Sequence, residues 1–185
     1  MGFISILLIA VGLSMDAFAV SVAKGLAVPE VRPRHALLAG VWFGGFQALM
    51  PVVGYLLASS FSAIVVSIDH WIAFALLSFI GLNMIREAVW GDEESGDEDF
   101  GPRKMFLMAV ATSIDALAVG VSMAFIDVDI VAAVLSIGVV TFLFSFAGIY
   151  LGRSVGSKLG KKAGILGGIV LIFIGIKIFI EHLSE

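Results

Sequence analysis

The chain has no cysteine and few charged residues among its 185 positions. Without cysteine it can form no disulfide, iron–sulfur cluster or thiolate metal site. Charged residues make up 14% of the chain and hydrophobic residues 60%, whereas soluble domains carry about 25% charged and 45–50% apolar residues. A water-soluble fold of this size could not bury so many apolar side chains. The bilayer is therefore the expected surrounding, and no nucleic-acid partner is expected.

Six apolar stretches are each long enough to cross a hydrocarbon core, which takes roughly 20 residues. They predict an all-α integral membrane protein with six transmembrane helices, at approximately Phe3–Lys24, Ala36–Leu57, His70–Ala88, Met105–Phe125, Ile130–Leu151 and Gly164–His182. The first of these stretches has no preceding basic segment and continues past Asp16. No cleaved signal peptide is therefore expected.

The basic residues are distributed very unevenly about these six stretches. Of the eleven lysines and arginines, all but Lys177 fall between helices 1 and 2, 3 and 4, or 5 and 6. These are Lys24, Arg32, Arg34, Arg86, Arg103, Lys104, Arg153, Lys158, Lys161 and Lys162. Lysine and arginine flanking membrane spans are enriched on the cytoplasmic side. We therefore expect both termini to face away from the cytoplasm, and these charges to orient the protein.

The chain also contains an internal repeat. The segment Ser14–Val22 recurs 99 positions later as Ser113–Val121 with six of nine residues identical, and Gly54 corresponds to Gly152. Each unit has three helices, an odd number, so the second copy must be inverted relative to the first. Inverted repeats are typical of transporters, with the site near the bilayer midplane between the repeats.

The repeat divides the chain into a first three-helix unit over residues 1–90, a linker over 91–102, and an inverted three-helix unit over 103–185. The linker carries six acidic residues, and we interpret it as a solvated, flexible connector. The alternative is a weak cation collector or sensor on the cytoplasmic side.

Asp16 and Asp115 occupy matching positions of the repeat, within roughly one helical turn of the bilayer centre. An aspartate at that depth costs about 2.5–3.5 kcal/mol on insertion scales and usually has a function. Two carboxylates facing each other in a low dielectric cannot both stay ionised. A divalent cation between them would relieve the repulsion, and the empty pair would hold protons. The alternative is a polar pair that joins two helices.

Further oxygen donors lie near the two aspartates. The hydroxyls of Ser14, Thr112 and Ser113 are within one turn of them, and Gln47 and Asn83 add amide oxygens. Pro51 supplies no N–H to the carbonyl of Gln47, which is then free to act as a ligand. Such oxygens suit Mg²⁺, Ca²⁺ or Mn²⁺ rather than copper or zinc. The alternatives are interhelical hydrogen bonds for the two amides and a packing kink for Pro51.

Two further patterns are interpreted as packing. Glycine recurs at every fourth position from Gly148 to Gly168, which permits close contact between helices. Met15 is a possible softer ligand beside Asp16, but we expect it to be a core methionine.

Taken together, these motifs resemble the MntP family of manganese efflux pumps. The segments that carry the resemblance are Leu13-Ser14-Met15-Asp16-Ala17-Phe18-Ala19, Phe43-Gly44-Gly45-Phe46-Gln47, His70-Trp71-Ile72-Ala73-Phe74, Thr112-Ser113-Ile114-Asp115-Ala116-Leu117-Ala118-Val119-Gly120, Gly160-Lys161-Lys162-Ala163 and Leu166-Gly167-Gly168. The resemblance implies a multi-pass exporter of the bacterial inner membrane that protects cells from excess Mn²⁺. It also implies that Asp16 and Asp115 are functionally important residues of the family. The family can have glutamate where this chain has Gln47.

The residues by themselves indicate only a transporter of hard cations. The resemblance is what implies Mn²⁺, as the transported substrate and not as a cofactor. One alternative is an exporter of small solutes such as amino acids, in which the aspartates recognise an ammonium group or relay protons. Another is a membrane scaffold or enzyme subunit without transport. The chain has no nucleophile–base pair, so an enzyme is not expected, and it has no phosphate-binding loop to power transport by ATP. Protons are the expected coupling ion.

Overall fold

The computed structural model describes residues 3–28, 30–90, 100–126 and 128–159, together with helical residues 165, 166, 169, 170, 172, 173, 176 and 180. Most side chains between residues 59 and 90 are not described. Within these ranges the regular elements are all helices, with no strand, as expected. The helices are α1 (Phe3–Ala27), α2 (Pro33–Trp90), α3 (Pro102–Thr112), α4 (Ile114–Met123) and α5 (Ile130–Leu159).

Three of the described helical segments are long and apolar enough to cross a membrane: Ile4–Ala27, Pro33–Ala58 and Ile130–Gly156. Helices α3 and α4 form a fourth candidate if they are taken as one span that bends by 44° at Ser113. The expected helix Met105–Phe125 is therefore broken in two. The expected spans at 70–88 and 164–182 fall on residues whose side chains lie largely outside the described part. The six-span arrangement thus remains a prediction.

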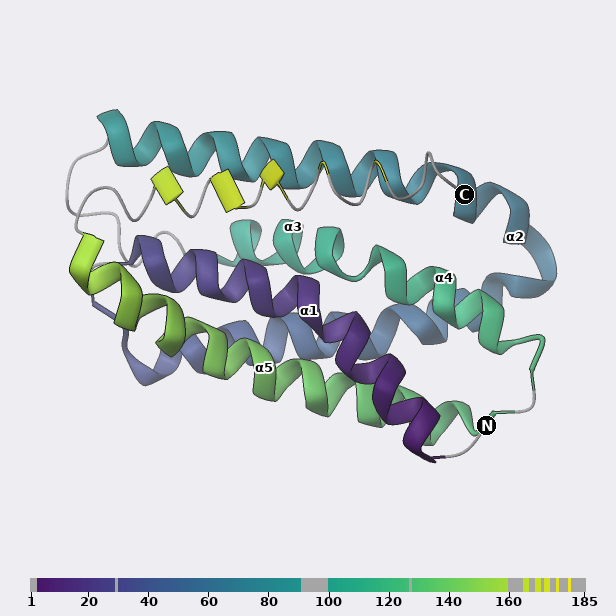
Figure 1. Cartoon of the computed structure of the whole chain (residues 1–185). Helices are drawn as coiled ribbons and strands as arrows, with labels where there is room; N and C mark the ends of the chain where they lie inside the picture. Colours follow the sequence, from purple (N-terminus) through teal and green to yellow (C-terminus); the bar gives the residue numbers. More distant parts are fainter. Residues whose placement is uncertain are drawn as a thin grey trace.

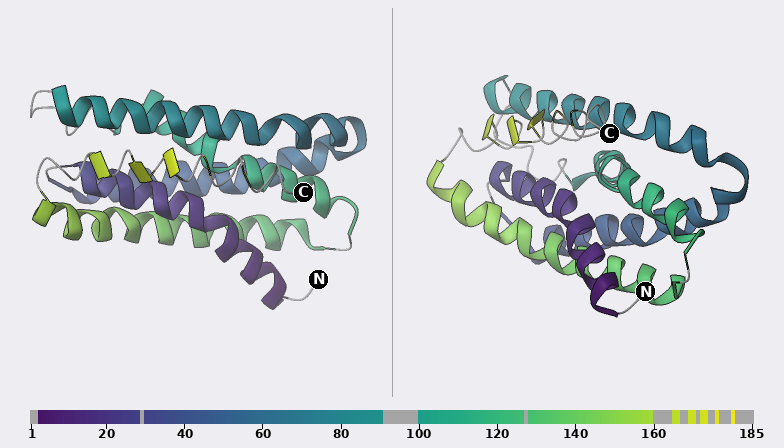
Figure 2. Two further views of the ribbon diagram at one scale, coloured as in Figure 1. Left: turned by 45° about the horizontal axis from the view of Figure 1, so that its top comes forward. Right: turned by 45° about the vertical axis from the view of Figure 1, so that its right-hand side comes forward.

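Helix α2 is longer than the sequence indicated. The stretch between Leu57 and His70 was expected to separate two spans, but it is helical throughout. Figure 1 shows that α2 turns back on itself, so that its two halves run in opposite directions. All the helices lie roughly along one axis (Figure 2).

Local sequence explains several helix starts. Proline occupies the first position of α2 and of α3, where its missing N–H costs no intrahelical bond. At the start of α5, the Asp129 carboxylate accepts 3.1 Å hydrogen bonds from the N–H groups of Val131 and Ala132. This is an N-cap, which satisfies donors that the helix itself leaves free.

Helices α1 and α5 run parallel and touch through their backbones. A Cβ added to Gly152 would collide with the carbonyl of Val22, and one added to Gly54 would collide with the carbonyl of Leu117 in α4. Only glycine permits such an approach. The expected packing role is confirmed for Gly148, Gly152 and Gly156, all of which contact α1. The remaining glycines of that series, at 160, 164 and 168, lie outside the described residues.

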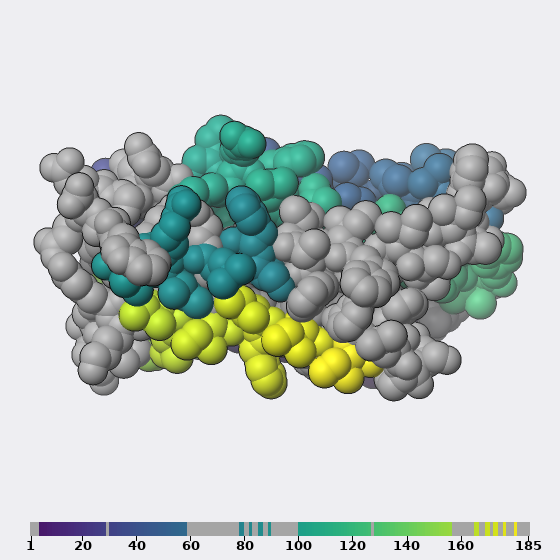
Figure 3. Space-filling view, turned by 90° about the horizontal axis from the view of Figure 1, so that it is seen from above, coloured from purple at the N-terminus to yellow at the C-terminus, as the bar shows by residue number. Residues whose placement is uncertain are grey.

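The outer surface of the bundle is apolar. Ile4, Leu56 and Phe125 are each at least 70% exposed. On the face in Figure 3, described side chains from the second half of α2 lie beside those of residues 165–180. Those that are large, apolar and exposed on these two segments are Phe79, Leu82, Val89, Leu166, Ile169, Phe173, Ile176 and Ile180. A surface of this kind fits lipid better than water.

Met15 belongs to this outer surface. Its side chain is 45% exposed, so the expectation of a core methionine was wrong. Asp16 follows it directly in α1, and successive helical residues point about 100° apart. That rotation turns one residue outward while its neighbour faces the interior.

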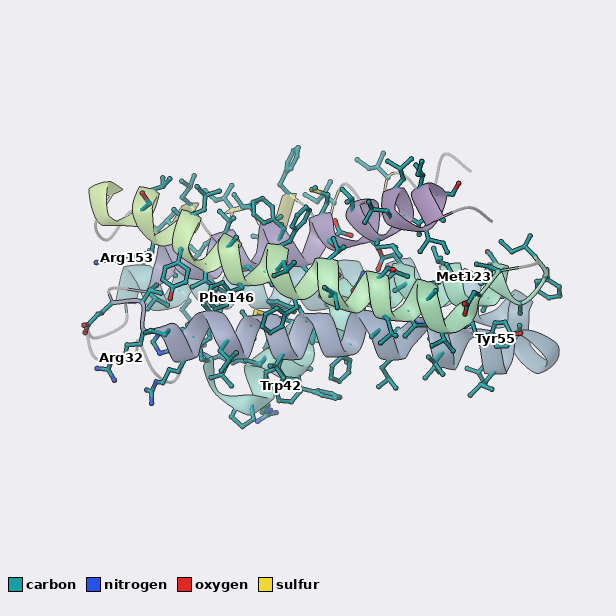
Figure 4. The ribbon with its side chains drawn as sticks, turned by 90° about the horizontal axis from the view of Figure 1, so that it is seen from below. Arg32, Trp42, Tyr55, Met123, Phe146 and Arg153 are labelled. Carbon is teal, nitrogen blue, oxygen red and sulfur yellow. The ribbon has the colours of Figure 1, made fainter. Side chains whose placement is uncertain are left out.

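The basic residues gather at one end of the bundle. Figure 4 shows Arg32 and Arg153 at the end opposite to Tyr55 and Met123. The side chain of Arg153 extends from α5 to the carbonyl of Val28, just beyond the end of α1. The charge asymmetry read from the sequence is therefore also an asymmetry of the folded molecule.

Candidate functional site

Gln47 lies where α1, α2 and α4 meet. Its side chain is completely buried, and its Nε2 donates a 2.8 Å hydrogen bond to the main-chain carbonyl of Leu13 in α1. The same side chain interacts with the carboxylate of Asp115 in α4. Its Oε1 atom is buried without a hydrogen-bond partner. One amide thus connects three helices and leaves one oxygen unused.

Asp115 lies in the first turn of α4. The polar groups acting on its carboxylate are the main-chain N–H groups of Asp115 and Ala116 and the side chain of Gln47. Its Oδ1 atom is buried and accepts no hydrogen bond. The carboxylate of Asp16 is near enough to repel it electrostatically. The fold therefore places the two aspartates of the repeat within electrostatic range of each other, although they are 99 positions apart in sequence.

The helix break at Ser113 is what gives Asp115 its helix N-terminus. One backbone hydrogen bond lies on each side of the break, from the N–H of Ser113 to the carbonyl of Val110 (3.2 Å) and from the N–H of Leu117 to the carbonyl of Ser113 (3.3 Å). The free N–H groups at a helix start, and its dipole, favour a negative charge. The break therefore stabilises the Asp115 carboxylate at a depth where few other donors exist.

The three hydroxyls proposed as ligands bond to their own helices. Ser14 donates to the carbonyl of Ala10 (2.5 Å), Thr112 to that of Met108 (2.9 Å) and Ser113 to that of Ala109 (2.7 Å). All three side chains are buried. Each hydroxyl proton is thereby used, while the oxygen keeps a lone pair that can still accept. Their role as ligands stays a prediction.

The remaining expected ligands are less well defined. The side chain of Asn83 lies outside the described residues. Pro51 is buried in α2, and its carbonyl abuts Gly120 of α4, so it lies in a helix contact near Gln47.

Sequence reasoning missed two polar residues of α5. Thr141 forms a 2.9 Å hydrogen bond with Ser14, and Ser145 is fully buried with no partner for its hydroxyl. The two are four positions apart and hence on one face of the helix. Polar residues at that spacing within an apolar stretch were the signal that could have found them.

A second unpredicted feature lies at the basic end. Lys24, expected on the membrane flank, is only 2% exposed, and its ammonium lies 5.0 Å above the ring of Phe100. The ring of His35 stacks on that of Phe100 at 4.5 Å. Phe100 lies near the C-terminal end of the linker and is itself buried. A cation–aromatic cluster therefore anchors the linker to the ends of α1 and α2.

The arrangement around Gln47 has more acceptors than donors. The acceptors are the carboxylates of Asp16 and Asp115 and the amide oxygen of Gln47. Of these, the Oδ1 of Asp115 and the Oε1 of Gln47 have no hydrogen-bond partner. Within the described residues, no three histidine, cysteine or acidic side chains gather at one point. An ion here would therefore be held by two carboxylates and neutral oxygens, a donor set typical of hard divalent cations.

Comparison with known proteins adds the family. A family model described as "Putative manganese efflux pump" matches residues 30–179. A relative from Desulfitobacterium hafniense is 52% identical over 184 residues, covering 100% of this chain and 97% of its own. Relatives from Acetivibrio thermocellus and Bifidobacterium adolescentis are 53% and 54% identical, covering 100% and 98% of this chain and 93% and 97% of their own. All three are named "Putative manganese efflux pump MntP". No solved structure matches.

Proposed function

This chain belongs to the MntP family of manganese efflux pumps, and from that premise we propose that its ion site lies between Asp16, Gln47 and Asp115. The chain is a membrane transporter that exports Mn²⁺. The observation that supports the proposed site is that the Asp115 carboxylate interacts with both the Asp16 carboxylate and the buried Gln47 amide, whose Oε1 has no hydrogen-bond partner. Asp16 and Gln47 belong to helices long enough to cross a bilayer, and Asp115 belongs to the bent pair α3–α4 that forms a further candidate span.

The proposed location is the bacterial inner membrane, with both termini outside the cytoplasm. The basic end of the bundle (Figure 4) would then face the cytoplasm. Mn²⁺ would enter from that end and leave at the end where Tyr55 and Met123 lie.

The proposed architecture is a pair of inverted three-helix repeats. Two helix contacts support it. Gly54 of α2 packs on α4, and its repeat counterpart Gly152 of α5 packs on α1. In repeat terms, the second helix of each unit packs on the first helix of the other unit. Such an exchange is what a two-fold axis in the membrane plane would produce.

Energy considerations favour coupling to protons. A divalent cation leaving a negative interior climbs about 2.3 kcal/mol per charge for each 100 mV, or roughly 4.6 kcal/mol in all. A passive channel would therefore admit Mn²⁺ instead of exporting it. The chain has no nucleotide motif to supply the energy. Asp16 and Asp115 can carry protons inward when they are free of the ion, and two protons per Mn²⁺ would move no net charge.

The test is Mn²⁺ movement in proteoliposomes with an imposed pH gradient and a clamped voltage. Proton coupling predicts that Mn²⁺ moves against a proton flux and stops when the gradient is collapsed. Transport that follows a sodium gradient instead would refute proton coupling. Competition by lysine but not by Mg²⁺ would favour the amino-acid exporter and count against the cation site.

A further inference from the structure

The break between α3 and α4 interrupts the helical hydrogen bonds to the last main-chain carbonyls of α3. In a continuous helix, the N–H groups of Asp115 and Ala116 would bond to the carbonyls of Ala111 and Thr112. Here those two N–H groups act on the Asp115 carboxylate instead. Among the hydrogen bonds in the described stretch 100–126, none from α4 reaches either carbonyl.

The hydroxyls near the break satisfy other carbonyls. Thr112 donates to the carbonyls of Met108 and Ala109, and Ser113 donates to those of Ala109 and Val110. Val110 also accepts the N–H of Ser113. The carbonyls before the break are thus supplied twice over, and the unsupplied ones are the last two of α3. A buried carbonyl without a partner costs free energy comparable to a lost hydrogen bond.

A second, independent observation points in the same direction. The Oε1 of Gln47 and the Oδ1 of Asp115 are also buried oxygens without donors. Gln47 is fully buried and acts on Asp115, which lies in the first turn of α4, directly after the break. Oxygens that lack protons to accept are the groups that a hard cation recruits. A bound ion within reach of these oxygens would give them a partner.

We propose that the main-chain carbonyls of Ala111 and Thr112 are ligands of the transported ion, alongside Asp115 and Gln47. This inference rests on the proposed ion site and extends it. It explains why the span breaks just before the aspartate, since an unbroken helix would keep both oxygens occupied. The C-terminal end of α3 carries the negative end of a helix dipole, which suits a cation. Broken helices bind ions in other transporters by the same physics.

The composition of the chain makes a direct test possible. Threonine occurs only at Thr112 and Thr141. Protein made with carbonyl-labelled [1-¹³C]threonine therefore carries two labels, and Thr141→Ser leaves one, at Thr112. Serine retains the hydroxyl that bonds to Ser14. Electron–nuclear double resonance of bound Mn²⁺ then reports whether the labelled carbon is attached to a coordinating oxygen.

The expected result is a strong ¹³C coupling in labelled Thr141→Ser and its absence in labelled Thr112→Ser. In the latter the label lies at Thr141, within the continuous helix α5. Addition of Asp115→Asn should abolish the Mn²⁺ signal itself. Stoichiometric Mn²⁺ binding without ¹³C coupling at Thr112 would overturn the carbonyl ligands and leave the aspartate site standing. Failure of the unlabelled protein to bind Mn²⁺ would overturn both.

Discussion

The Nε2 atom of Gln47 lies 2.8 Å from the carbonyl oxygen of Leu13, which places an α2 side chain against the backbone of α1 three residues before Asp16. Because the same side chain acts on Asp115, it links the backbone of α1 near Asp16 to the carboxylate in α4.

Gln47→Leu should weaken Mn²⁺ binding while leaving the helices assembled. The substitution removes a buried amide that donates a 2.8 Å hydrogen bond to Leu13, worth about 1 kcal/mol, and leaves an apolar group of similar size. We expect a roughly fivefold rise in the Mn²⁺ concentration for half-maximal export. Export assays in vesicles would measure it. Leu49→Ala, at a 51% exposed position two residues on, is the control, and equal losses in both variants would contradict the assignment.

Asp16→Asn and Asp115→Asn should each abolish export without removing the protein from the membrane. Both substitutions keep the side-chain shape and remove only the charge that binds the ion. The matched control is Asp129→Asn, where the carboxylate caps α5 on an exposed surface and asparagine caps equally well. Growth in excess Mn²⁺ is the measurement. Full protection by either membrane-span variant would refute the ion site.

Gly54→Ala should destabilise the protein. Its new methyl group would meet the main-chain carbonyl of Leu117, which cannot move without separating α2 from α4. Overpacking of this kind typically costs about 1–3 kcal/mol. Gly45→Ala is the control in the same helix, because nothing lies within 4 Å of its added Cβ, and there alanine should stabilise by up to about 1 kcal/mol. Thermal unfolding in detergent distinguishes the two, and equal melting temperatures would count against backbone contact.

Reporters fused at Met1 and Glu185 should be found outside the cytoplasm, and one inserted within residues 91–99 should be found inside. The reason is the basic end of the bundle, which holds Arg32 and Arg153 (Figure 4). Paired phosphatase and fluorescent fusions, active on opposite sides of the membrane, provide the readout. A cytoplasmic C-terminus would contradict six spans.

The helical class and the positions of several spans could be predicted from the sequence because apolar length alone determines them. Asp16 and Asp115 could be singled out because charge is rare in an apolar stretch. The break at Ser113 could not, because Ser14 occupies the matching repeat position within the unbroken helix α1. Nearly the same nine residues adopt both forms, so packing against neighbouring helices decides between them. The burial of Lys24 was equally hidden, since it depends on Phe100, distant in sequence.

The glycine contacts of α2 with α4 also determine the distance between these two helices. Where two backbones touch at Gly54 and Gly120, the spacing of the helices is set by the dimensions of the peptide unit, which do not vary from one sequence to another. Residues that face the lipid can then be substituted without altering the spacing of α2, which carries Gln47, and α4, which carries Asp115. The helix spacing around the ion site would therefore stay the same when the membrane composition or the lipid-facing residues change. At these glycines even the one carbon that alanine adds would push the two backbones apart.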